Sequence, residues 1–293
     1  GYYLEDLPDS VDLATVQSNN DFVGSTIESD VGIYTSIQAA VDTADSGDTV
    51  SVGPGTYNES VSISTANVTL EGPNAGTPGY TDSRATEAVM QQGVEIAADN
   101  VTLNGFEITN NGGNGVKVSD APSNVVITNN LIADIAGGTA GDQKAFANGI
   151  NLQFNTAFEK TSTGTEITNN EITNITTEDM SVNSNDVIGI QLLPRGNDVE
   201  DLRIADNVIS DIDPGDASNS GRAEARGISI DTQFENTSGG TRGDLGQPIG
   251  LVVEGNEIRD LDSDFSRAIN LFEDKGGDTN TNDAIGPVNF TIA

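Results

Sequence analysis

The ten residues EITNNEITNI, at positions 166–175, recur along the chain in altered form and decide how it folds. Related stretches are VITNNLIADI at 126–135, RIADNVISDI at 203–212 and VVEGNEIRDL at 252–261. Each has an aliphatic residue at its second position, an asparagine three residues later, and further aliphatic residues five and eight residues later. Repetition of this kind is typical of solenoid proteins, in which each repeat packs only on its neighbours.

Within each repeat the aliphatic residues alternate with polar ones, which is the pattern of short strands with one buried face. A second strand follows in each repeat, in the stretches GVKVS (115–119), GINLQF (149–154), GIQLL (189–193), GISID (227–231) and AINLF (268–272). The pattern predicts an all-β fold, a right-handed parallel β-helix whose coils stack along one axis. Three consecutive coils have long connections before this strand, and we expect them to project as loops from one corner.

The recurring asparagines have a structural explanation in such a stack. Asparagine tolerates the left-handed backbone region of a turn, and its amide can hydrogen-bond the equivalent amide one coil away. The sequence therefore predicts a structural ladder that runs through the coils, formed by Asn130, Asn170, Asn207 and Asn256.

A different signature lies at 34–72, YTSIQAAVDTADSGDTVSVGPGTYNESVSISTANVTLEG. Ile37, Ala40, Val41 and Ala44 have helical spacing, and Thr35 or Ser36 can cap the helix. The segment resembles the opening of pectin-lyase-like β-helix proteins, a superfamily that includes pectin methylesterases, polysaccharide lyases and many secreted haloarchaeal surface proteins. The resemblance extends over residues 34–293 and implies a β-helix with a short N-terminal capping helix. It implies little about function, because this scaffold serves enzymes, adhesins and viral fibres.

Residues 1–33 lie outside this pattern and are predicted to form an N-terminal arm, followed by the β-helix domain at 34–293. The arm either packs along its own rod or meets a neighbouring subunit. At the other end, GPVNFTIA (286–293) reads as the first strand of a further coil. Its open edge is expected to be covered by further sequence or by another chain.

The charge of the chain restricts its surroundings and its partners. The 46 acidic residues outnumber the 12 basic ones, giving a net charge of −34. Salt screens such repulsion, so the composition favours an extracellular protein of an extreme halophile. Binding to nucleic acid or insertion into a membrane is not expected, since neither a basic patch nor a long apolar run is present. No signal peptide is recognised in the first residues either.

The residue inventory also excludes much of enzyme chemistry. Cysteine and histidine are absent, which removes disulfides, thiolate nucleophiles and the commonest general base. No residue is assigned a catalytic role. Arg195, Arg226 with Asp231, and Lys117 are the candidates, although arginines in so acidic a chain are most simply partners in surface ion pairs. No segment reproduces the site motifs of the esterases or lyases in the resembled superfamily.

Two acidic stretches suggest a metal site, with calcium as the one candidate cofactor. The first places oxygen ligands at alternate positions and the second repeats this spacing: Asp278, Asn280, Asn282 and Asp283, then Asp260, Asp262 and Asp264. A calcium loop would have glycine where Asp283 stands and a glutamate at its twelfth position. The alternative is a solvated acidic loop.

Modification and sugar stacking complete the candidate sites. Six N-glycosylation sequons begin at Asn58, Asn67, Asn100, Asn174, Asn236 and Asn289, and we expect Asn58, in the turn GTYNES, to be accessible. Phe154, Phe158 and Phe234 lie near the corner of the long connections, where they either stack on sugars or belong to the core.

These features favour an extracellular structural or adhesive protein at a cell or virion surface, such as a filament, surface-layer or fibre component. Its expected partners are copies of itself or other surface proteins, through the N-terminal arm and the last coil. The alternatives are a glycan-active enzyme, either a polysaccharide lyase or an esterase, and a non-catalytic carbohydrate-binding module, each using the lateral groove of the β-helix.

Overall fold

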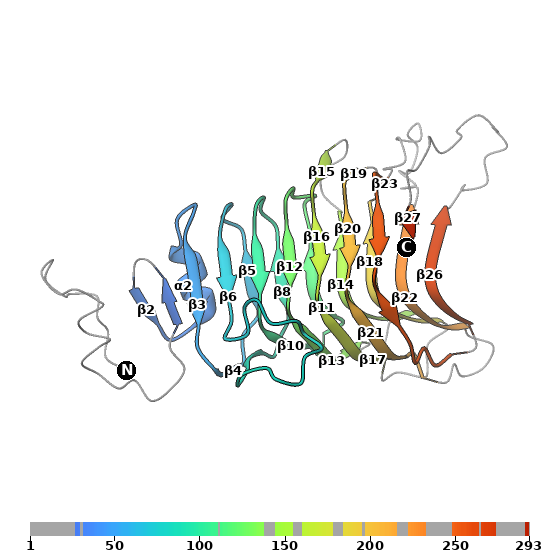
Figure 1. Ribbon diagram of the computed structural model, residues 1–293, viewed down its shortest axis with the longest axis horizontal. Helices are drawn as coiled ribbons and strands as arrows, with labels where there is room; N and C mark the ends of the chain where they lie inside the picture. The colour runs from blue at the N-terminus through green and yellow to red at the C-terminus, as the bar shows by residue number, and fades with distance from the viewer. Residues whose placement is uncertain are drawn as a thin grey trace, which may run out of the picture.

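The chain winds into a rod of stacked coils, coloured from blue to red along its length (Figure 1). The structure is a computed structural model that describes residues 27–29, 32–110, 112–137, 144–154, 160–177, 184–194, 197–215, 222–232, 248–263, 265–273 and 291–292. Strands in successive coils pair in parallel, so the predicted right-handed parallel β-helix is confirmed. Each coil runs through three sheets, here named A, B and C.

Sheet A begins with an antiparallel hairpin and continues with one parallel strand from each coil. Its strands, in spatial order, are β2 (Gly32–Tyr34), β1 (Ile27–Ser29), β3 (Thr49–Val52), β6 (Thr69–Glu71), β9 (Thr102–Asn104), β12 (Val126–Thr128), β16 (Glu166–Thr168), β20 (Arg203–Ala205), β24 (Val252–Glu254) and β27 (Thr291–Ile292). Strands β1 and β2 thus join residues before position 34 to the solenoid.

Sheets B and C follow sheet A in every coil. Sheet B contains β4 (Gly55–Tyr57), β7 (Ala88–Met90), β10 (Glu107–Asn110), β13 (Leu131–Gly137), β17 (Glu171–Thr177), β21 (Val208–Asp213) and β25 (Glu257–Ile258). Sheet C contains β5 (Val61–Ile63), β8 (Val94–Ile96), β11 (Asn114–Val118), β14 (Lys144–Gln153), β18 (Ser184–Leu193), β22 (Arg222–Thr232) and β26 (Phe265–Glu273). A small additional sheet joins β15 (Thr161–Thr163), β19 (Asp198–Glu200) and β23 (Pro248–Ile249).

The predicted capping helix is present as α2 (Ile37–Thr43). Ser36 is its N-cap, and the Ser36 side chain accepts a hydrogen bond from the Ala39 amide at 3.3 Å. The Glu59 carboxylate accepts a hydrogen bond from the backbone amide of Ile37, the first residue of the helix, at 2.8 Å. A carboxylate is favourable at a helix N-terminus, so Glu59 ties the helix to the first coil.

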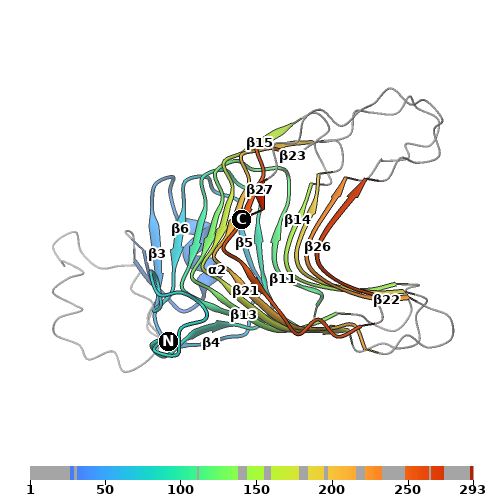
Figure 2. The ribbon, with the colours of Figure 1, turned by 45° about the vertical axis from the view of Figure 1, so that its right-hand side comes forward.

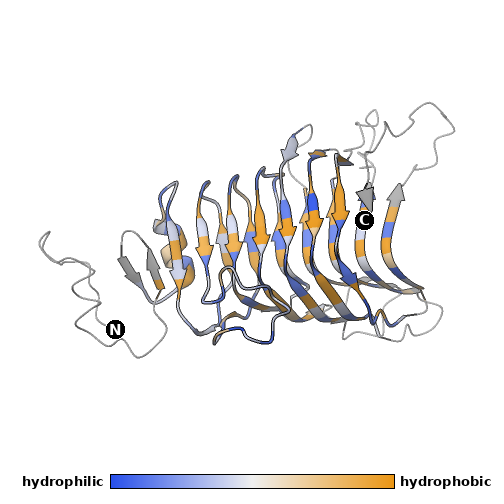
Figure 3. Cartoon of the chain, in the orientation of Figure 1, coloured by the Kyte–Doolittle hydropathy of each residue, from blue (hydrophilic) through white to orange (hydrophobic). Residues whose placement is uncertain are grey.

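The core forms because inward positions repeat from coil to coil, as the orange bands on the strands show (Figure 3). Ile127, Ile167 and Ile204 are paired in register on neighbouring strands of sheet A, and all three are fully buried. Each aliphatic side chain therefore packs on its equivalent in the coils before and after it. Burial of one such side chain contributes about 1.5–3 kcal/mol.

The asparagines of the repeat form a ladder inside the stack. The amide nitrogen of Asn130 donates to Asn170 Oδ1 at 3.1 Å, Asn170 to Asn207 at 3.0 Å, and Asn207 to Asn256 at 2.9 Å. Each amide nitrogen also donates to a backbone carbonyl, that of Leu103 for the first rung. The ladder asparagines therefore satisfy one another, as buried polar groups must.

One detail of the expected turn was wrong. The left-handed backbone belongs to the residue before each ladder asparagine, with φ of 58° at Asn129, 57° at Asn169 and 55° at Asp206. The preceding residue absorbs the sharp bend between sheets A and B. This leaves the ladder asparagine free to point its amide along the stack.

The long connections project from the body of the rod, as expected, but their described residues are mostly strand rather than loop. Most of their residues extend the strands, so that β13, β17 and β21 continue outward and β14, β18 and β22 return beside them (Figure 2). Inside this two-layered wing, the buried side chains come from both layers: Ile135, Ile175 and Ile212 from sheet B, and Ala147, Val187 and Ala225 from sheet C. Repeated aliphatic positions in consecutive coils let the wing pair in parallel, as the body does.

Candidate functional site

The outer face of sheet C carries polar side chains in rows that run along the rod. One row lies before the bend of each strand and is polar except for the buried Ile188: Asn114, Asn148, Ile188, Arg226 and Arg267. A second row contains Lys117, Asn151, Gln191, Ser229 and Asn270. The strands β14, β18, β22 and β26 curve, so this face is concave (Figure 2).

Glycines at equivalent positions of three strands allow the curvature. A Cβ on Gly149 would lie 2.4 Å from Cγ2 of Ile172, and one on Gly189 would lie 2.6 Å from Cγ2 of Ile209. Gly227 is equally close to its neighbouring isoleucine, Ile258. The strands of sheets B and C approach each other so closely here that only a residue without Cβ fits. The glycine column thus places the two polar rows around a bend.

A charged cluster occupies the C-terminal half of this face. The Glu224 side chain is 4% exposed, and it pairs with the guanidinium groups of both Arg226 and Arg267. Arg226 Nε donates to Glu224 Oε2 at 2.9 Å, and Arg267 Nη1 lies 3.0 Å from the same oxygen. The paired charges offset the cost of holding Glu224 away from water.

Asp231 extends this charged cluster along the same strand. Its Oδ2 lies 3.7 Å from Arg226 Nη1, and its carboxylate accepts hydrogen bonds from Ser229 at 3.1 Å and from the Asn270 amide at 3.2 Å. Gln191 Nε2 approaches it at 3.4 Å. Burial raises the pKa of the Asp231 carboxyl, while Arg226 opposes that shift. The result is a buried carboxyl that holds its proton more readily than a solvated one.

Uncharged amides occupy the neighbouring coils of the same face. Asn148 and Asn151, each 4% exposed, both donate through their amide nitrogens to Oδ1 of Asn114, at 3.0 and 2.9 Å. The Oδ1 atoms of Asn148 and Asn151 are buried and have no hydrogen-bond partner. An unsatisfied buried acceptor costs about 1–3 kcal/mol, so this pair marks a place for a hydrogen-bond donor.

The other candidate residues from the sequence fall into different settings. Lys117 pairs with Glu95 at 2.9 Å, and its hydrogen bond lowers the pKa of the Glu95 carboxyl. Phe154 is only 1% exposed and belongs to the core, so it cannot offer a stacking face and that alternative was wrong for this residue. Arg195, Phe158 and Phe234 lie outside the described residues.

The metal candidates are only partly described. Asp260 pairs with Arg259 at 3.0 Å, and the amide of Asp262 donates to the carbonyl of Ile212. Asp264, Asp278, Asn280, Asn282 and Asp283 lie outside the described residues. Where the chain is described, no three acidic side chains gather into a metal-binding group. The calcium hypothesis stays a prediction.

The sequons differ in how their amides are used. Asn58 is exposed, and its Oδ1 accepts from Gln92 at 2.7 Å. The amide nitrogen of Asn67 donates to Ser46, and that of Asn174 donates to Asp134. Asn100 Oδ1 accepts from Asn124 in a left-handed turn. Asn236 and Asn289 lie outside the described residues. The four described sequon asparagines, Asn58 among them, are all exposed, and glycosylation stays a prediction.

Sequence reasoning named Arg226 and Asp231 but missed most of their neighbours. Glu224, Ser229, Arg267, Asn148 and Asn151 all contribute to the concave face. The signal was present in the second strand of each repeat, where polar residues alternate with the aliphatic ones of GINLQ and GISID. In a strand of a solenoid these polar residues must face outward.

Comparisons with known proteins concern the fold alone. No family model matches the chain, and no curated protein matches its sequence. Two solved structures of the pectin methylesterase from Aspergillus niger are similar over 84% of both chains, the deglycosylated form at 13% identity with a TM-score of 0.35, and the penultimately deglycosylated form at 14% identity with a TM-score of 0.36. We transfer no residue role from them. None of the helices in the described ranges is long and apolar enough to cross a membrane.

Proposed function

We propose that the protein binds a carbohydrate polymer along the concave outer face of sheet C. The observation that carries the proposal is the buried charged cluster of Glu224, Arg226 and Asp231 on an outward-facing surface. Outward residues of a solenoid strand normally face water and need no partners. Burying charged groups there costs stability, and such clusters are frequent at functional sites.

The chemistry of this face suits hydroxyl-rich ligands. Carboxylates accept hydrogen bonds, guanidinium groups donate them, and the amides of Gln191 and Asn270 do both. Equivalent positions repeat along the axis at about 4.8 Å, so an extended chain of sugar units meets a polar group at each coil.

The test is a binding screen of neutral and acidic polysaccharides by affinity electrophoresis in molar salt. Arg226→Ala removes the guanidinium that joins Glu224 to Asp231, and we expect binding to weaken at least tenfold. Arg259→Ala is the matched control, because Arg259 pairs with Glu257 and Asp260 on sheet B. Equal binding by both variants, with folding verified by circular dichroism, would refute the proposal.

A catalytic role is the second candidate, and the pKa of Asp231 favours it. A buried carboxyl with a raised pKa, next to an arginine and a serine, is the kind of group that transfers protons in an active site. If the protein is a lyase or an esterase, Asp231→Asn should abolish turnover of methylated or free uronate polymers while binding persists. The readouts are unsaturated product and released methanol, and turnover by Asp231→Asn would exclude this role.

The surroundings of this activity follow from charge. We infer an extracellular, salt-rich setting from the net charge of −34, and an adhesive role at a surface is consistent with carbohydrate binding. Self-association belongs to the same proposal. Light scattering in molar salt tests it directly: oligomers support an assembly role, and a uniform monomer removes it without affecting carbohydrate binding.

A further inference from the structure

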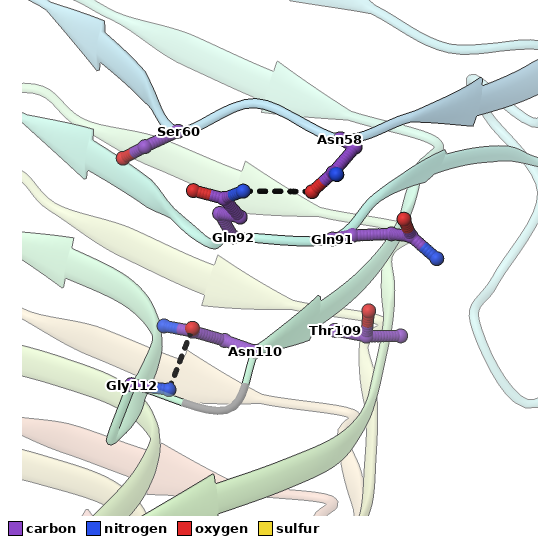
Figure 4. Close-up of a pocket in the computed structure, with 7 residues that line it drawn as sticks. All are labelled: Asn58, Ser60, Gln91, Gln92, Thr109, Asn110 and Gly112. Atoms are coloured by element: carbon purple, nitrogen blue, oxygen red, sulfur yellow. Dashed lines mark hydrogen bonds between the residues drawn. The ribbon is translucent and has the colours of Figure 1, made fainter.

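We propose a second site, for an uncharged saccharide, in a pocket at the corner between sheets B and C. The pocket has a volume of about 650 Å³ and is lined by Asn58, Ser60, Gln91, Gln92, Thr109, Asn110 and Gly112 (Figure 4). It lies several coils from the charged cluster and does not depend on the role proposed there.

Three successive turns build this neutral pocket. They connect β4 to β5, β7 to β8 and β10 to β11, and each contributes at least one amide side chain. These coils have short turns, whereas the next coil extends into the wing formed by β13 and β14. The pocket therefore lies at the step where the wing begins, and its size is within the range of small-molecule sites, about 300–1,000 Å³.

The side chains of the neutral pocket are partly fixed and partly available. Gln92 Nε2 donates to Asn58 Oδ1 at 2.7 Å, and the Gly112 amide donates to Asn110 Oδ1 at 2.8 Å. Within the described part of the chain, the side chains of Gln91 and Thr109 make no hydrogen bond, and in Figure 4 they extend to the same side. Both side chains are therefore available to hydrogen-bond a ligand.

The lining determines the class of ligand. Each amide has a donor and an acceptor, so it can bind two adjacent hydroxyl groups of a sugar at once. The lining contains no cation to hold an anion and no carboxylate to hold a metal ion. An uncharged, hydroxyl-rich ligand is the class that remains.

The lining of the neutral pocket is connected by hydrogen bonds to the buried amides of sheet C. Asn110, in the lining, donates to the carbonyl of Asn114, whose side chain holds the amides of Asn148 and Asn151. The buried oxygens of those two amides have no donor. Asn148 and Asn151 do not line the neutral pocket, so their oxygens belong to the proposed site on sheet C, and Asn110 is the residue that connects the two sites.

The experiment is a titration with neutral oligosaccharides of glucose, galactose and mannose in molar salt, monitored through the amide NMR spectrum of the protein. The protein is produced in a host that attaches no glycans, so that Asn58 stays unmodified. We expect shifts at Gln91, Gln92 and Asn110, and at least tenfold weaker binding in the double variant Gln91→Ala/Gln92→Ala. Thr102→Ala, on sheet A, is the control that should bind as the native protein does.

Two outcomes overturn the inference. One is the absence of binding by every neutral oligosaccharide at millimolar concentration. The other is unchanged binding in the double variant when its spectrum shows a folded protein. Arg226→Ala separates this site from the proposed function, because it should leave neutral oligosaccharide binding at the pocket unchanged while polymer binding on sheet C weakens at least tenfold.

Discussion

The asparagine ladder and the outer face of sheet C both bury polar side chains, but they differ in regularity. In the ladder the same residue type recurs at Asn130, Asn170 and Asn207, and each amide is satisfied by the next. On sheet C the equivalent positions change at every coil, from Asn151 to Gln191 to Ser229. Regular burial serves the scaffold, whereas irregular burial with unsatisfied or charged groups indicates recognition.

The largest expected effect is the loss of stability when the asparagine ladder is interrupted. Asn170→Ala removes the acceptor used by Asn130 and the donor to the carbonyl of Ile127. Several buried groups then lack partners, so the free energy of unfolding should fall by roughly 3–5 kcal/mol. Urea unfolding in molar salt measures it. Asn256→Ala, at the partly exposed end of the described ladder, is the matched variant and should cost less.

The bend between the two polar rows is the next target. Gly189→Ala places a methyl group 2.6 Å from both Ile209 Cγ2 and the carbonyl oxygen of Gly227. We expect a loss of about 1–3 kcal/mol from overpacking, because the backbone oxygen can move only with its strand. A stability equal to that of the native protein would show that the curvature of sheet C does not require glycine.

The buried Oδ1 atoms of Asn148 and Asn151, which have no hydrogen-bond partner, allow a direct test of the difference between the ladder and sheet C. Asn151→Leu removes an acceptor that has no donor, and Asn114 Oδ1 keeps its hydrogen bond from Asn148, so the free energy of unfolding should change by less than about 1 kcal/mol in the absence of a ligand. Asn170→Leu, in the ladder, removes satisfied groups and should be strongly destabilising. Similar losses in the two variants would mean that the sheet C amides are as structural as the ladder.

The smallest effect is a dependence on pH. Because burial raises the pKa of Asp231 in the folded protein, the folded state keeps this proton to higher pH than the unfolded state does. Ionisation therefore costs stability, from about pH 4, where an unfolded aspartate titrates, up to the raised pKa. Asp231→Asn should lose this dependence. Urea unfolding of both proteins at about pH 4 and pH 7 measures this dependence. An equal change in the free energy of unfolding between the two pH values, for the native protein and for Asp231→Asn, would contradict it.

The fold was predictable because it rests on repetition. Spacing alone placed Ile127, Ile167 and Ile204 in one buried column, and the helical spacing from Ile37 to Val41 placed α2. The wing was not predictable, since the residues that extend its strands carry little strand pattern of their own. A stretch such as KAFANG, 144–149, has no strong strand pattern of its own.

The candidate site was predictable only in part. Arg226 and Asp231 attracted notice because charged residues flank an aliphatic strand. Arg267, which pairs with Glu224, and Asn270, which donates to Asp231, come from the next coil, roughly 40 residues later in sequence, and only the register of β22 and β26 brings them to this site. The neutral pocket joins three turns in the same way. Contacts between coils depend on register, which the motif does not contain.

The central claim is that the irregular face of sheet C, not the regular ladder, recognises a carbohydrate. Hydrogen exchange with and without the best-binding polysaccharide of the screen tests it most directly. The account predicts added protection in the three long strands of that face, 144–153, 184–193 and 222–232. Protection confined to sheets A and B, or no protection with any bound polysaccharide, would contradict it.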